Sequence, residues 1–391
     1  MASITATNAI EEETYDDYVA EEFYPARIGE VIKSSGEEYE IIGKLGFGRH
    51  STVWLCRERG DDKFYTLKLT ISHHPHTTNR EADIYTLIQS LPPSPHAGRA
   101  HVRELREAFE IQGPEGRHWC LVHPVLGLSV QEWLEGFEGG RVPVGVMKGL
   151  VRCLLEALDF LHEEAGVIHT DIQASNIHLA LSSTSPIDSF VAAEKDHPSP
   201  HKTVDSQRTI YRSRRLSVAL DPEPGVPTLT DFGLAVRDAH VPHAGLIQPL
   251  LFRAPEVILR MPWDWRADVW NLGVLMWQLM FNQHLFDGET EGEQLRGMVA
   301  SLGPPPPEFV LQGRLGVREL YFDDDGVWRG DPITPDPLGE SLEGEEAGEF
   351  LDLLMGMVRW VPGERKSARE LLGHPWLAVG GDGAGEEAGR E

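Results

Sequence analysis

Two aspartates and an asparagine have the types and spacing needed for phosphoryl transfer. Asp171 and Asn176 lie five positions apart in His169-Thr-Asp-Ile-Gln-Ala-Ser-Asn176, and Asp231 opens the later segment Asp231-Phe-Gly233. Asp171 can accept the proton of an attacking hydroxyl group. The side-chain oxygens of Asn176 and Asp231 suit Mg²⁺, a hard cation that prefers oxygen ligands. The three side chains therefore predict hydroxyl attack on the phosphoryl group of a magnesium-bound nucleotide.

A glycine-containing turn between two strand-like runs is the candidate phosphate-binding segment. Because glycine has no Cβ, Gly46 and Gly48 allow backbone amides to approach phosphate oxygens. Ser51 stands where a third glycine is common, and a two-glycine turn alone is more often a simple hairpin. The predicted nucleotide-contacting residues of this turn are Leu45, Gly46, Phe47, Gly48, Arg49, His50, Ser51, Thr52 and Val53.

Lys68 ends an apolar strand-like run, YTLK, fifteen residues after Val53. An unpaired ammonium group in such surroundings is costly, so Lys68 needs a negative partner. Glu81, on the next predicted helix, can supply it. Without the other motifs, the favoured alternative would be a lysine whose ammonium group extends to the surface.

Three further residues are predicted to support the fold rather than the chemistry. Glu256, in Ala254-Pro-Glu256, can form a buried ion pair with Arg365 from a later helical region. Asp268 opens an apolar helix, where its carboxylate can cap the helix and bind the backbone around Asp171.

The scaffold predicted for these residues is a small β-rich part followed by a larger helical part. From Tyr39 the runs YEIIGKLG, STVWLCRE and KFYTLKLT indicate an antiparallel sheet. Residues 79–91 carry apolar side chains at helical spacing, and the chain is mostly helical after about residue 127. The most apolar helix is expected over residues 269–281.

Four segments depart from this pattern. Residues 1–38 hold ten acidic and two basic residues and are predicted to be a mobile acidic arm. Residues 181–225 are rich in serine and proline and predict a flexible insertion. Residues 285–350 are strongly acidic and are expected to be rich in loops. Residues 378–391, rich in Gly and Glu, are expected to be a disordered tail.

Composition limits the location and the partners of the chain. The 391 residues carry a net charge of −27, which disfavours nucleic acid as a direct partner and suits a basic peptide. The three cysteines are scattered and predict a reducing compartment. A secretory signal is not apparent and the longest apolar run is too short to cross a bilayer. We therefore expect a cytoplasmic or nuclear protein that does not bind membranes.

Over residues 39–377 the chain resembles the eukaryotic protein kinases, and within them the SR-protein kinase family of serine/threonine kinases. The resemblance rests on the order of the motifs above. It also rests on LGFGRHSTVWLCRE, on HTDIQASNI with threonine where most kinases have arginine, and on RADVWNLG, LGPPPPEF and RKSARELLGHPWL. It implies an α+β, bilobal protein-kinase fold. An antiparallel β N-lobe with one main helix would span residues 39–126, and a mostly α-helical C-lobe residues 127–377.

The resemblance also implies roles for single residues. Lys68 would contact the phosphates of ATP and pair with Glu81, Asp171 would be the catalytic base, and Asn176 and Asp231 would hold Mg²⁺. The segment 123–126 would be the hinge, where the backbone at Pro124 and Leu126 reads the adenine. The family phosphorylates serines in Arg/Ser-rich proteins, so a basic protein substrate is expected here by analogy.

Two positions differ from the usual serine/threonine kinase pattern. Gln173 replaces a lysine near the transferring phosphate, and Pro249 replaces the threonine that bonds this lysine. Loss of that positive charge costs about 2–3 kcal/mol in the transition state, or roughly 30- to 150-fold in rate. The base and the metal ligands are retained, so slow catalysis is expected. The alternative is a pseudokinase that binds protein partners as a scaffold.

Regulation is also predicted from sequence. Residues 234–253 contain no Ser, Thr or Tyr, and Thr170 replaces the arginine that binds an activation-segment phosphate in many kinases. Activity is therefore expected to be independent of activation-segment phosphorylation. Within the insertion, Arg212-Ser-Arg-Arg-Leu-Ser217 is either a solvated linker, a phosphorylated stretch, or a tethered pseudosubstrate.

Overall fold

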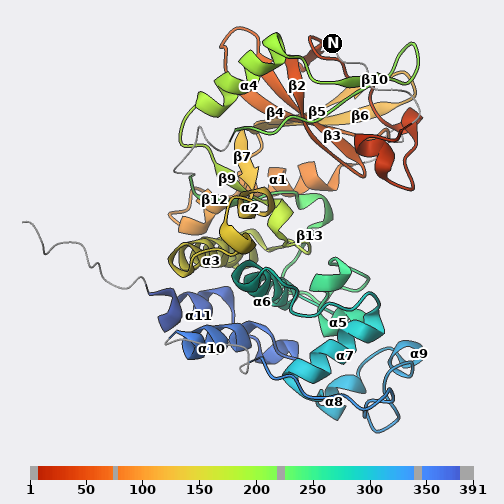
Figure 1. Ribbon diagram of the computed structural model, residues 1–391, viewed down its shortest axis with the longest axis vertical. Coiled ribbons are helices and arrows are strands. Elements are labelled where there is room, and N and C mark those ends of the chain that lie inside the picture. The colour runs from red at the N-terminus through yellow and green to blue at the C-terminus, as the bar shows by residue number, and fades with distance from the viewer. Residues whose placement is uncertain (1–7, 74–77, 218–224, 339–345, 379–391) are drawn as a thin grey trace, which may run out of the picture. The chain divides into compact units, whose positions relative to one another are not determined.

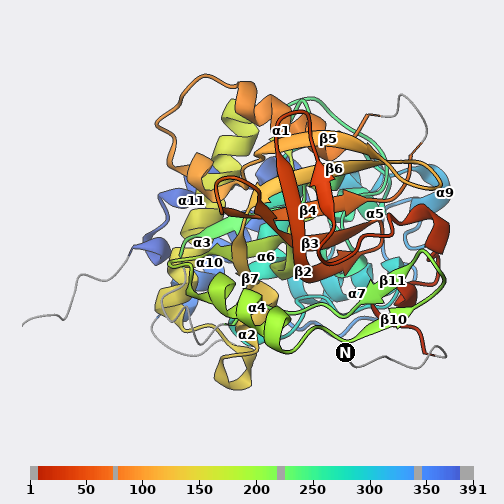
Figure 2. The same ribbon diagram turned by 90° about the horizontal axis from the view of Figure 1, so that it is seen from above.

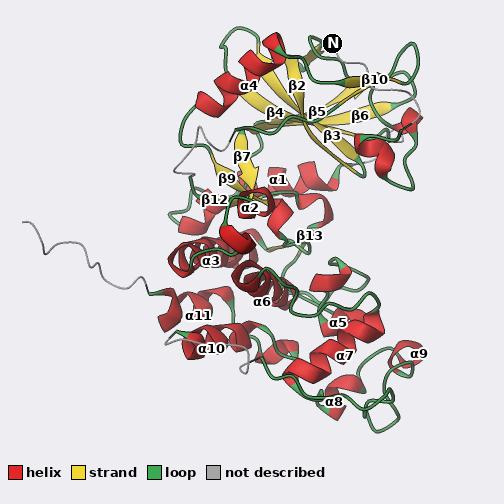
Figure 3. Cartoon of the chain, viewed as in Figure 1, coloured by secondary structure: helices red, strands yellow, loops and turns green. Residues whose placement is uncertain are grey.

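The computed structural model describes residues 8–73, 78–217, 225–338 and 346–378. The chain forms two compact units. The first comprises Met1–Ser94, Val102–Trp133 and Ser175–Gly233, and the second comprises Pro95–His101, Leu134–Ala174 and Leu234–Glu391. Strands dominate the first unit and helices the second (Figure 1, Figure 3).

A six-stranded antiparallel sheet is the centre of the first unit, with strand order β1-β2-β3-β4-β6-β5. In that order the strands span Val31–Lys33, Glu38–Gly48, Ser51–Glu58, Phe64–Thr70, Arg117–Pro124 and Glu107–Gln112. The three runs singled out in the sequence form β2, β3 and β4. The predicted antiparallel sheet is thus confirmed.

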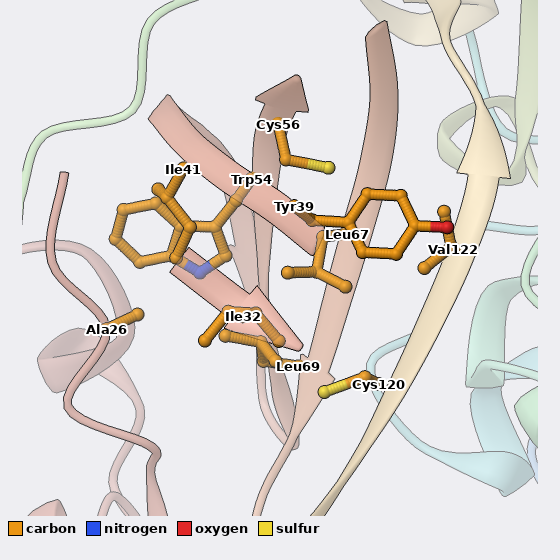
Figure 4. Packing of buried hydrophobic residues seen from close by; sticks show 10 residues of the cluster. All are labelled: Ala26, Ile32, Tyr39, Ile41, Trp54, Cys56, Leu67, Leu69, Cys120 and Val122. Atoms are coloured by element: carbon orange, nitrogen blue, oxygen red, sulfur yellow. The ribbon is translucent and has the colours of Figure 1, made fainter. Parts of the chain in front are cut away.

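One face of this sheet carries a continuous apolar core (Figure 4). Successive strands contribute residues two positions apart, as expected when side chains alternate between the faces of a strand. The contributing pairs are Tyr39 and Ile41, Trp54 and Cys56, Leu67 and Leu69, and Cys120 and Val122. Ala26 and Ile32 complete the cluster, so the segment before β2 belongs to the folded unit.

Smaller elements surround the sheet. Helices α1, α2 and α4 span Arg80–Ser90, Val130–Leu134 and Ser185–Asp196. A second sheet has the order β12-β9-β7, with strands Pro227–Leu229, Ile177–Ala180 and Leu126–Ser129. Strands β10 and β11, His201–Thr203 and Thr209–Tyr211, form a hairpin.

The insertion at residues 181–225 differs from the flexible segment that its composition predicts. It contains α4 and the β10–β11 hairpin, and three of its residues, Ile187, Phe190 and Leu216, form a buried cluster with Leu55 of β3. A Cβ at Gly43 of β2 would lie only 2.8 Å from the Phe190 ring, so glycine is required for this close approach. Residues 218–224 of the insertion lie outside the described residues.

The N-terminal arm also differs from its prediction as a mobile segment. Residues 8–38 include two short 3-10 turns, Glu11–Thr14 and Ala20–Glu22, and the strand β1. Ile10 and Phe23 are buried at 7% exposure each, although the composition around them is acidic. A few apolar anchors fix the arm to the first unit.

The second unit is built from eight helices among its described residues. Helices α3, α5, α6 and α7 span Val144–Asp159, Pro255–Ile258, Arg266–Phe281 and Glu291–Leu302. Helices α8 to α11 span Pro307–Val310, Leu315–Arg318, Ala347–Met357 and Ala368–Leu372. Two short strands, β8 at Val167–Ile168 and β13 at Val236–Arg237, pair antiparallel.

Helix α6 is the predicted apolar helix, and nearly its whole circumference is buried. None of the helices in the described ranges combines the length and apolar character needed to cross a membrane. The acidic segment 285–350 contains α7, α8, α9 and the start of α10, and its other described residues lie outside these helices. Of the predicted tail, only Ala378 is among the described residues.

Candidate active site

The glycine-containing turn and Lys68 are brought together by the register of β2, β3 and β4. Gly46 and Gly48 of β2 lie opposite Val53 and Ser51 of β3, and Val53 lies opposite Lys68 of β4. The pairing of β2 with β3 shifts between Lys44 and Gly46, which is a β-bulge of the kind that is frequent beside active sites. The sheet therefore holds the turn and the ammonium group on adjacent strands.

Lys68 bridges two carboxylates, as its position on an apolar strand predicts. Its Nζ donates to Glu81 Oε2 at 2.7 Å and to Asp231 Oδ1 at 2.9 Å. Glu81 lies in the first turn of α1, where negative charge is favourable, and Asn79 caps this helix by accepting from the backbone N–H of Ala82 at 3.0 Å. The predicted pair of Lys68 and Glu81 is confirmed.

The charges of this cluster depend on each other. Burial would lower the pKa of Lys68, but the Asp231 and Glu81 carboxylates outweigh burial and raise it, so the ammonium stays protonated. The side chains of Lys68 and Glu81 are 16% and 7% exposed, whereas Asp231 is 48% exposed. Asp231 is thus the member of the cluster that solvent or a cation can reach.

Asn176 and Asp231 are placed near each other by backbone bonding. The carbonyl oxygen of Asn176 accepts from the N–H of Thr230 at 2.8 Å and from Thr230 Oγ1 at 3.0 Å. Asp231 is the next residue and has a positive φ of 62°, a left-handed backbone often found at functional sites. One predicted metal ligand, Asn176, is therefore bonded to the residue that directly precedes the other, Asp231.

The segment after Asp231 is fixed by an aromatic contact that the motif did not reveal. Phe232 is fully buried, and its ring lies 5.2 Å from that of Tyr85 of α1 in a T-shaped arrangement. The ring of Tyr85 also lies 5.0 Å from that of His123. Helix α1, which carries Glu81, is thereby connected to the Asp231 segment by packing as well as by charge.

Two histidines and an arginine interact electrostatically with Asp231. His123 is fully buried, Nδ1 lies 2.7 Å from the carbonyl oxygen of Glu104, and burial and then Arg103 hold its pKa well below the usual value. Burial likewise lowers the pKa of His178 to about 3. The Arg103 cation interacts electrostatically with Glu81 and Asp231. Sequence analysis did not identify Arg103 or His178.

The predicted hinge lies where β6 ends and β7 begins. Pro124 is the last residue of β6 and pairs with Tyr65 of β4, and Leu126 is the first residue of β7. Proline has no backbone N–H, so only its carbonyl oxygen can bind a ligand there. The hinge assignment of Pro124 and Leu126 stays a prediction.

In the second unit, helix α6 holds the backbone of the segment that carries Asp171. The fully buried Asp268 carboxylate accepts from the N–H groups of His169 and Thr170 at 2.7 and 2.8 Å and from His162 Nε2 at 2.9 Å. Asn271, one turn later, bonds both backbone groups of Ile172. The predicted bond from Asp268 to this backbone is confirmed. Its predicted capping role is wrong, because the N-cap residue is Trp265.

The side chain of Gln173 contacts the predicted catalytic base. Its Nε2 donates to Asp171 Oδ1 at 3.0 Å. A lysine at this position would bring a positive charge, whereas the neutral amide orients one oxygen of the carboxylate by a hydrogen bond. The sequence identified the substitution but gave no indication of this contact.

The segment from Leu234 to Arg253 is held at both ends by hydrogen bonds and an ion pair. Thr170 Oγ1 donates to the carbonyl oxygen of Leu234 at 3.0 Å, and β13 pairs with β8. At the other end Gln248 donates to the carbonyl oxygen of Ala267 at 2.8 Å and accepts from the N–H of Ala254 at 2.9 Å. Arg253 pairs with Glu291 of α7 at 2.8 Å.

The second predicted structural pair is also present. Arg365 donates to both oxygens of Glu256, at 2.7 and 2.6 Å, and neither side chain is more than 1% exposed. A bidentate pair of this kind has the geometry that offsets the desolvation of buried charges. It joins α5 to the segment before α11.

Comparison with known proteins agrees with this arrangement. A family model described as the protein kinase domain matches residues 39–212 and 217–377. The chain belongs to the protein kinase family. A serine/threonine protein kinase of Aspergillus fumigatus is 38% identical over 94% of this chain and 91% of its own length. SRSF protein kinase 3 of Mus musculus is 34% identical over 94% of this chain and 90% of its own.

Further comparisons extend this result. The Physarum polycephalum serine/threonine-protein kinase SRPK is 27% identical over 94% of this chain and 92% of its own. The crystal structure of another kinase domain matches with a TM-score of 0.69 and 21% identity, over 91% of this chain and 99% of that chain, which supports the fold. The chain is thus a serine/threonine protein kinase with the predicted α+β kinase fold.

The structure groups the predicted site residues of this kinase within each unit. In the first unit Lys68, Glu81 and Asp231 form one charged cluster, Asn176 is bonded next to Asp231, and the glycine turn lies on the neighbouring strands. Asp171 lies in the second unit. The described residues contain no group of three or more His, Cys, Asp or Glu side chains arranged for a metal ion. The predicted Mg²⁺ ligands are one carboxylate, Asp231, and one amide, Asn176, so they are not a group of this kind.

Proposed function

We propose that this kinase transfers the γ-phosphoryl group of MgATP to serines in basic, Arg/Ser-rich protein segments. The observation that carries the proposal is the cluster of Lys68, Glu81 and Asp231 next to Asn176. Relatives named SRPK and SRSF protein kinase 3, together with the net charge of −27, support a basic substrate. The same charge disfavours nucleic acid, and the free Cys56, Cys120 and Cys153 fit a cytoplasmic or nuclear location.

The residues present fit a magnesium nucleotide. Lys68 is a protonated ammonium group for the phosphates, and Gly46 has no heavy atom within 4 Å of the position that a Cβ would take. The half-exposed Asp231 carboxylate and the Asn176 amide oxygen are the oxygen donors that Mg²⁺ prefers. The metal ion would supply positive charge to the triphosphate when bound.

Asp171 is assigned as the base that accepts the proton of the substrate hydroxyl. Gln173 holds Oδ1 of this carboxylate, and Asp268 and Asn271 hold the backbone on either side. Such supports limit the orientations that the base can adopt, which contributes to catalysis by positioning. Because the positive charge of the lysine is missing, we still expect a slow enzyme, with a rate lowered by roughly 30- to 150-fold.

Independence from activation-segment phosphorylation is part of the proposal. The contacts made by Thr170, Gln248 and Arg253 occupy both ends of the segment with uncharged hydrogen bonds and one ion pair. In kinases that require phosphorylation, new phosphate–arginine pairs order this segment. Here protein groups already provide the order.

One assay with MgATP and an Arg/Ser peptide tests the proposal against the scaffold alternative. We expect measurable turnover in the parent, loss of turnover in Asp171→Asn, and an increase of about tenfold or more in Gln173→Lys, since the lysine restores transition-state charge. Phosphatase treatment of the parent is expected to leave turnover unchanged. Turnover absent from both the parent and Gln173→Lys would favour a scaffold, and turnover lost with phosphatase would contradict phosphorylation independence.

A further inference from the structure

The N-terminal arm (residues 1–38) contacts the strand that leads into the glycine turn through a buried ion pair. Lys44 of β2 is 1% exposed and is bonded to Glu12 of the arm, which is 6% exposed. Glu11 lies 3.5 Å from the same ammonium group. Removing one partner of a buried pair leaves an uncompensated charge, which is strongly destabilising. Docking of the arm and the position of β2 at Lys44 are therefore coupled.

The arm also reaches the turn itself. Arg49, at the tip, pairs with Asp17 at 2.7 Å and lies over the ring of Tyr15, with its guanidinium carbon 5.3 Å from the ring centre. The rings of Tyr15 and Phe47 are 6.0 Å apart. These exposed contacts are individually weak. Together with Lys44 they give the arm contacts at the base and at the tip of the turn.

The insertion (residues 181–225) holds the arm on its other side (Figure 2). Lys202 of β10 donates to the carbonyl oxygen of Asn8 at 3.1 Å and to both carboxylate oxygens of Glu13 at 2.8 and 2.9 Å. Arg208 Nε donates to the carbonyl oxygen of Ala20 at 3.1 Å. The cavity between the arm, the insertion and β3 measures only about 20 Å³. The two segments are closely packed.

Ser213 connects all three parts. Its Oγ donates to Glu11 Oε2 at 2.5 Å, and the next residue, Arg214, donates its backbone N–H to the carbonyl oxygen of Lys44 at 2.9 Å. Glu11 has a positive φ of 55°, a conformation that costs a non-glycine residue free energy unless its contacts maintain it. The bond from Ser213 to Glu11 is one of those contacts.

We propose that Ser213 is a phosphorylation site and that its modification releases the N-terminal arm from the glycine turn. Ser213 is partly exposed and lies between Arg212 and Arg214, the setting expected for a kinase that selects basic segments. The bond from Ser213 Oγ to the γ-phosphorus of a nucleoside triphosphate forms while the β–γ bridging bond breaks. The hydroxyl proton passes to the base of the modifying kinase, and the nucleoside diphosphate leaves.

The result of this modification follows from charge. The hydroxyl that donates to Glu11 is replaced by a phosphate group, which carries a charge of about −1.5 to −2 at neutral pH. This negative group faces the same carboxylate. Repulsion separates Ser213 from Glu11, and Glu11 and Glu12 lose the geometry that places them on Lys44. The arm then no longer restrains the turn. This proposal holds whichever kinase modifies Ser213, so it does not require the proposed function.

Charge variants of the full chain test the release without using its activity. In Ser213→Asp we expect amide hydrogen exchange of residues 10–18 to accelerate about tenfold and the dissociation constant for ATP to change about threefold or more. The matched control is Ser217→Asp, which places the same charge on an exposed serine of the same basic stretch. In Ser213→Asp with Glu11→Gln, removal of the carboxylate charge should restore slow exchange.

The outcomes are distinct. Equal exchange of the arm in Ser213→Asp and Ser217→Asp would overturn the release mechanism, as would a failure of Glu11→Gln to restore protection. An unchanged melting temperature checks that the variants remain folded. Phosphopeptide mapping of the chain expressed in a eukaryotic host should find phosphate on Ser213. Phosphate on other serines but not on Ser213 would overturn the assignment of the site.

Discussion

At the scale of single residues, His178 has an environment that makes its charge state predictable. It precedes Leu179 in β9, lies 3.2 Å from Thr230 Oγ1 through Nδ1, and its pKa is lowered to about 3 by burial and then by Arg103. The pKa of a histidine free in solution is about 6.5. Between these two values only the unfolded chain binds the proton at this residue.

This difference predicts a loss of stability in acid. Since the unfolded state binds more protons there, stability rises with pH up to about 6.5 and falls as the pH drops toward 3, the pKa in the folded state. When the pH is lowered from about 7.5 to about 5, protonation of this residue in the unfolded chain should lower the free energy of unfolding by roughly 1–2 kcal/mol. His178→Leu should reduce this loss, because leucine has no group that binds the proton. The Thr230 hydroxyl keeps a partner in this variant, since its Oγ1 still donates to the carbonyl oxygen of Asn176.

Denaturant unfolding of the parent and of His178→Leu at the two pH values measures the effect. The control is His240→Leu, since the side chain of His240 is 56% exposed. A parent and a His178→Leu variant that lose the same stability on acidification would contradict a neutral imidazole with a lowered pKa at this position.

The residues of the motifs could be predicted from sequence, but several of their neighbours could not. Lys68 was paired with Glu81 because a buried ammonium group needs a carboxylate, and this pair is present. Arg103 lies far from the motifs in sequence, and His178 follows Asn176 by two positions but belongs to no motif. Their electrostatic interaction with Asp231 depends on the register of several strands, which local patterns do not determine.

At the scale of elements, helix α6 determines the position of the segment that carries the base. Two of its residues, Asp268 and Asn271, bond the backbone of residues 169, 170 and 172. They lie one helical turn apart and so share a face. Two polar side chains on an otherwise apolar helix thus bind backbone N–H groups of the loop, which would otherwise need partners in regular secondary structure.

We predict that Asp268→Asn destabilises the second unit and lowers turnover. The amide has one acceptor oxygen where the carboxylate has two, so its NH₂ group would face a backbone N–H and leave it unsatisfied. We expect a loss of about 2–4 kcal/mol in the free energy of unfolding and a drop in kcat larger than the change in KM for ATP.

Thermal unfolding and steady-state kinetics measure these effects. Asp287→Asn is a suitable control, because Asp287 is exposed. An Asp268→Asn variant with the melting temperature and kcat of the parent would show that the carboxylate does not hold the loop.

Elements with regular patterns were predicted well, and elements with unusual composition were not. Strands β2, β3 and β4, helix α1 and helix α6 follow from period-two or helical spacing. The arm and the insertion were predicted to be mobile from their charge and their serine and proline content. Single apolar residues such as Ile10, Phe190 and Leu216 are buried in them, and averages over composition do not detect such anchors.

At the scale of the whole molecule, charge is the property that sequence gives most directly. The chain has 62 acidic and 35 basic residues, hence a net charge of −27. Many of the basic groups are already paired, as Arg365 is with Glu256 and Lys202 with Glu13. The remaining excess of carboxylates creates a long-range negative potential around the protein. The net charge does not identify the individual carboxylates that bind the basic residues of a substrate.

This potential predicts that association with a basic substrate depends on salt. Raising ionic strength from about 20 mM to about 200 mM shortens the screening length from roughly 20 Å to below 10 Å, so the attraction acts only near contact. We expect kcat/KM for an Arg/Ser peptide to fall about tenfold over this range, mainly through slower association. The same peptide with its arginines replaced by glutamine has no charge to attract and should change less than about twofold. A similar fall for both peptides would mean that salt acts on the enzyme itself, and the acidic surface would then have no part in substrate selection.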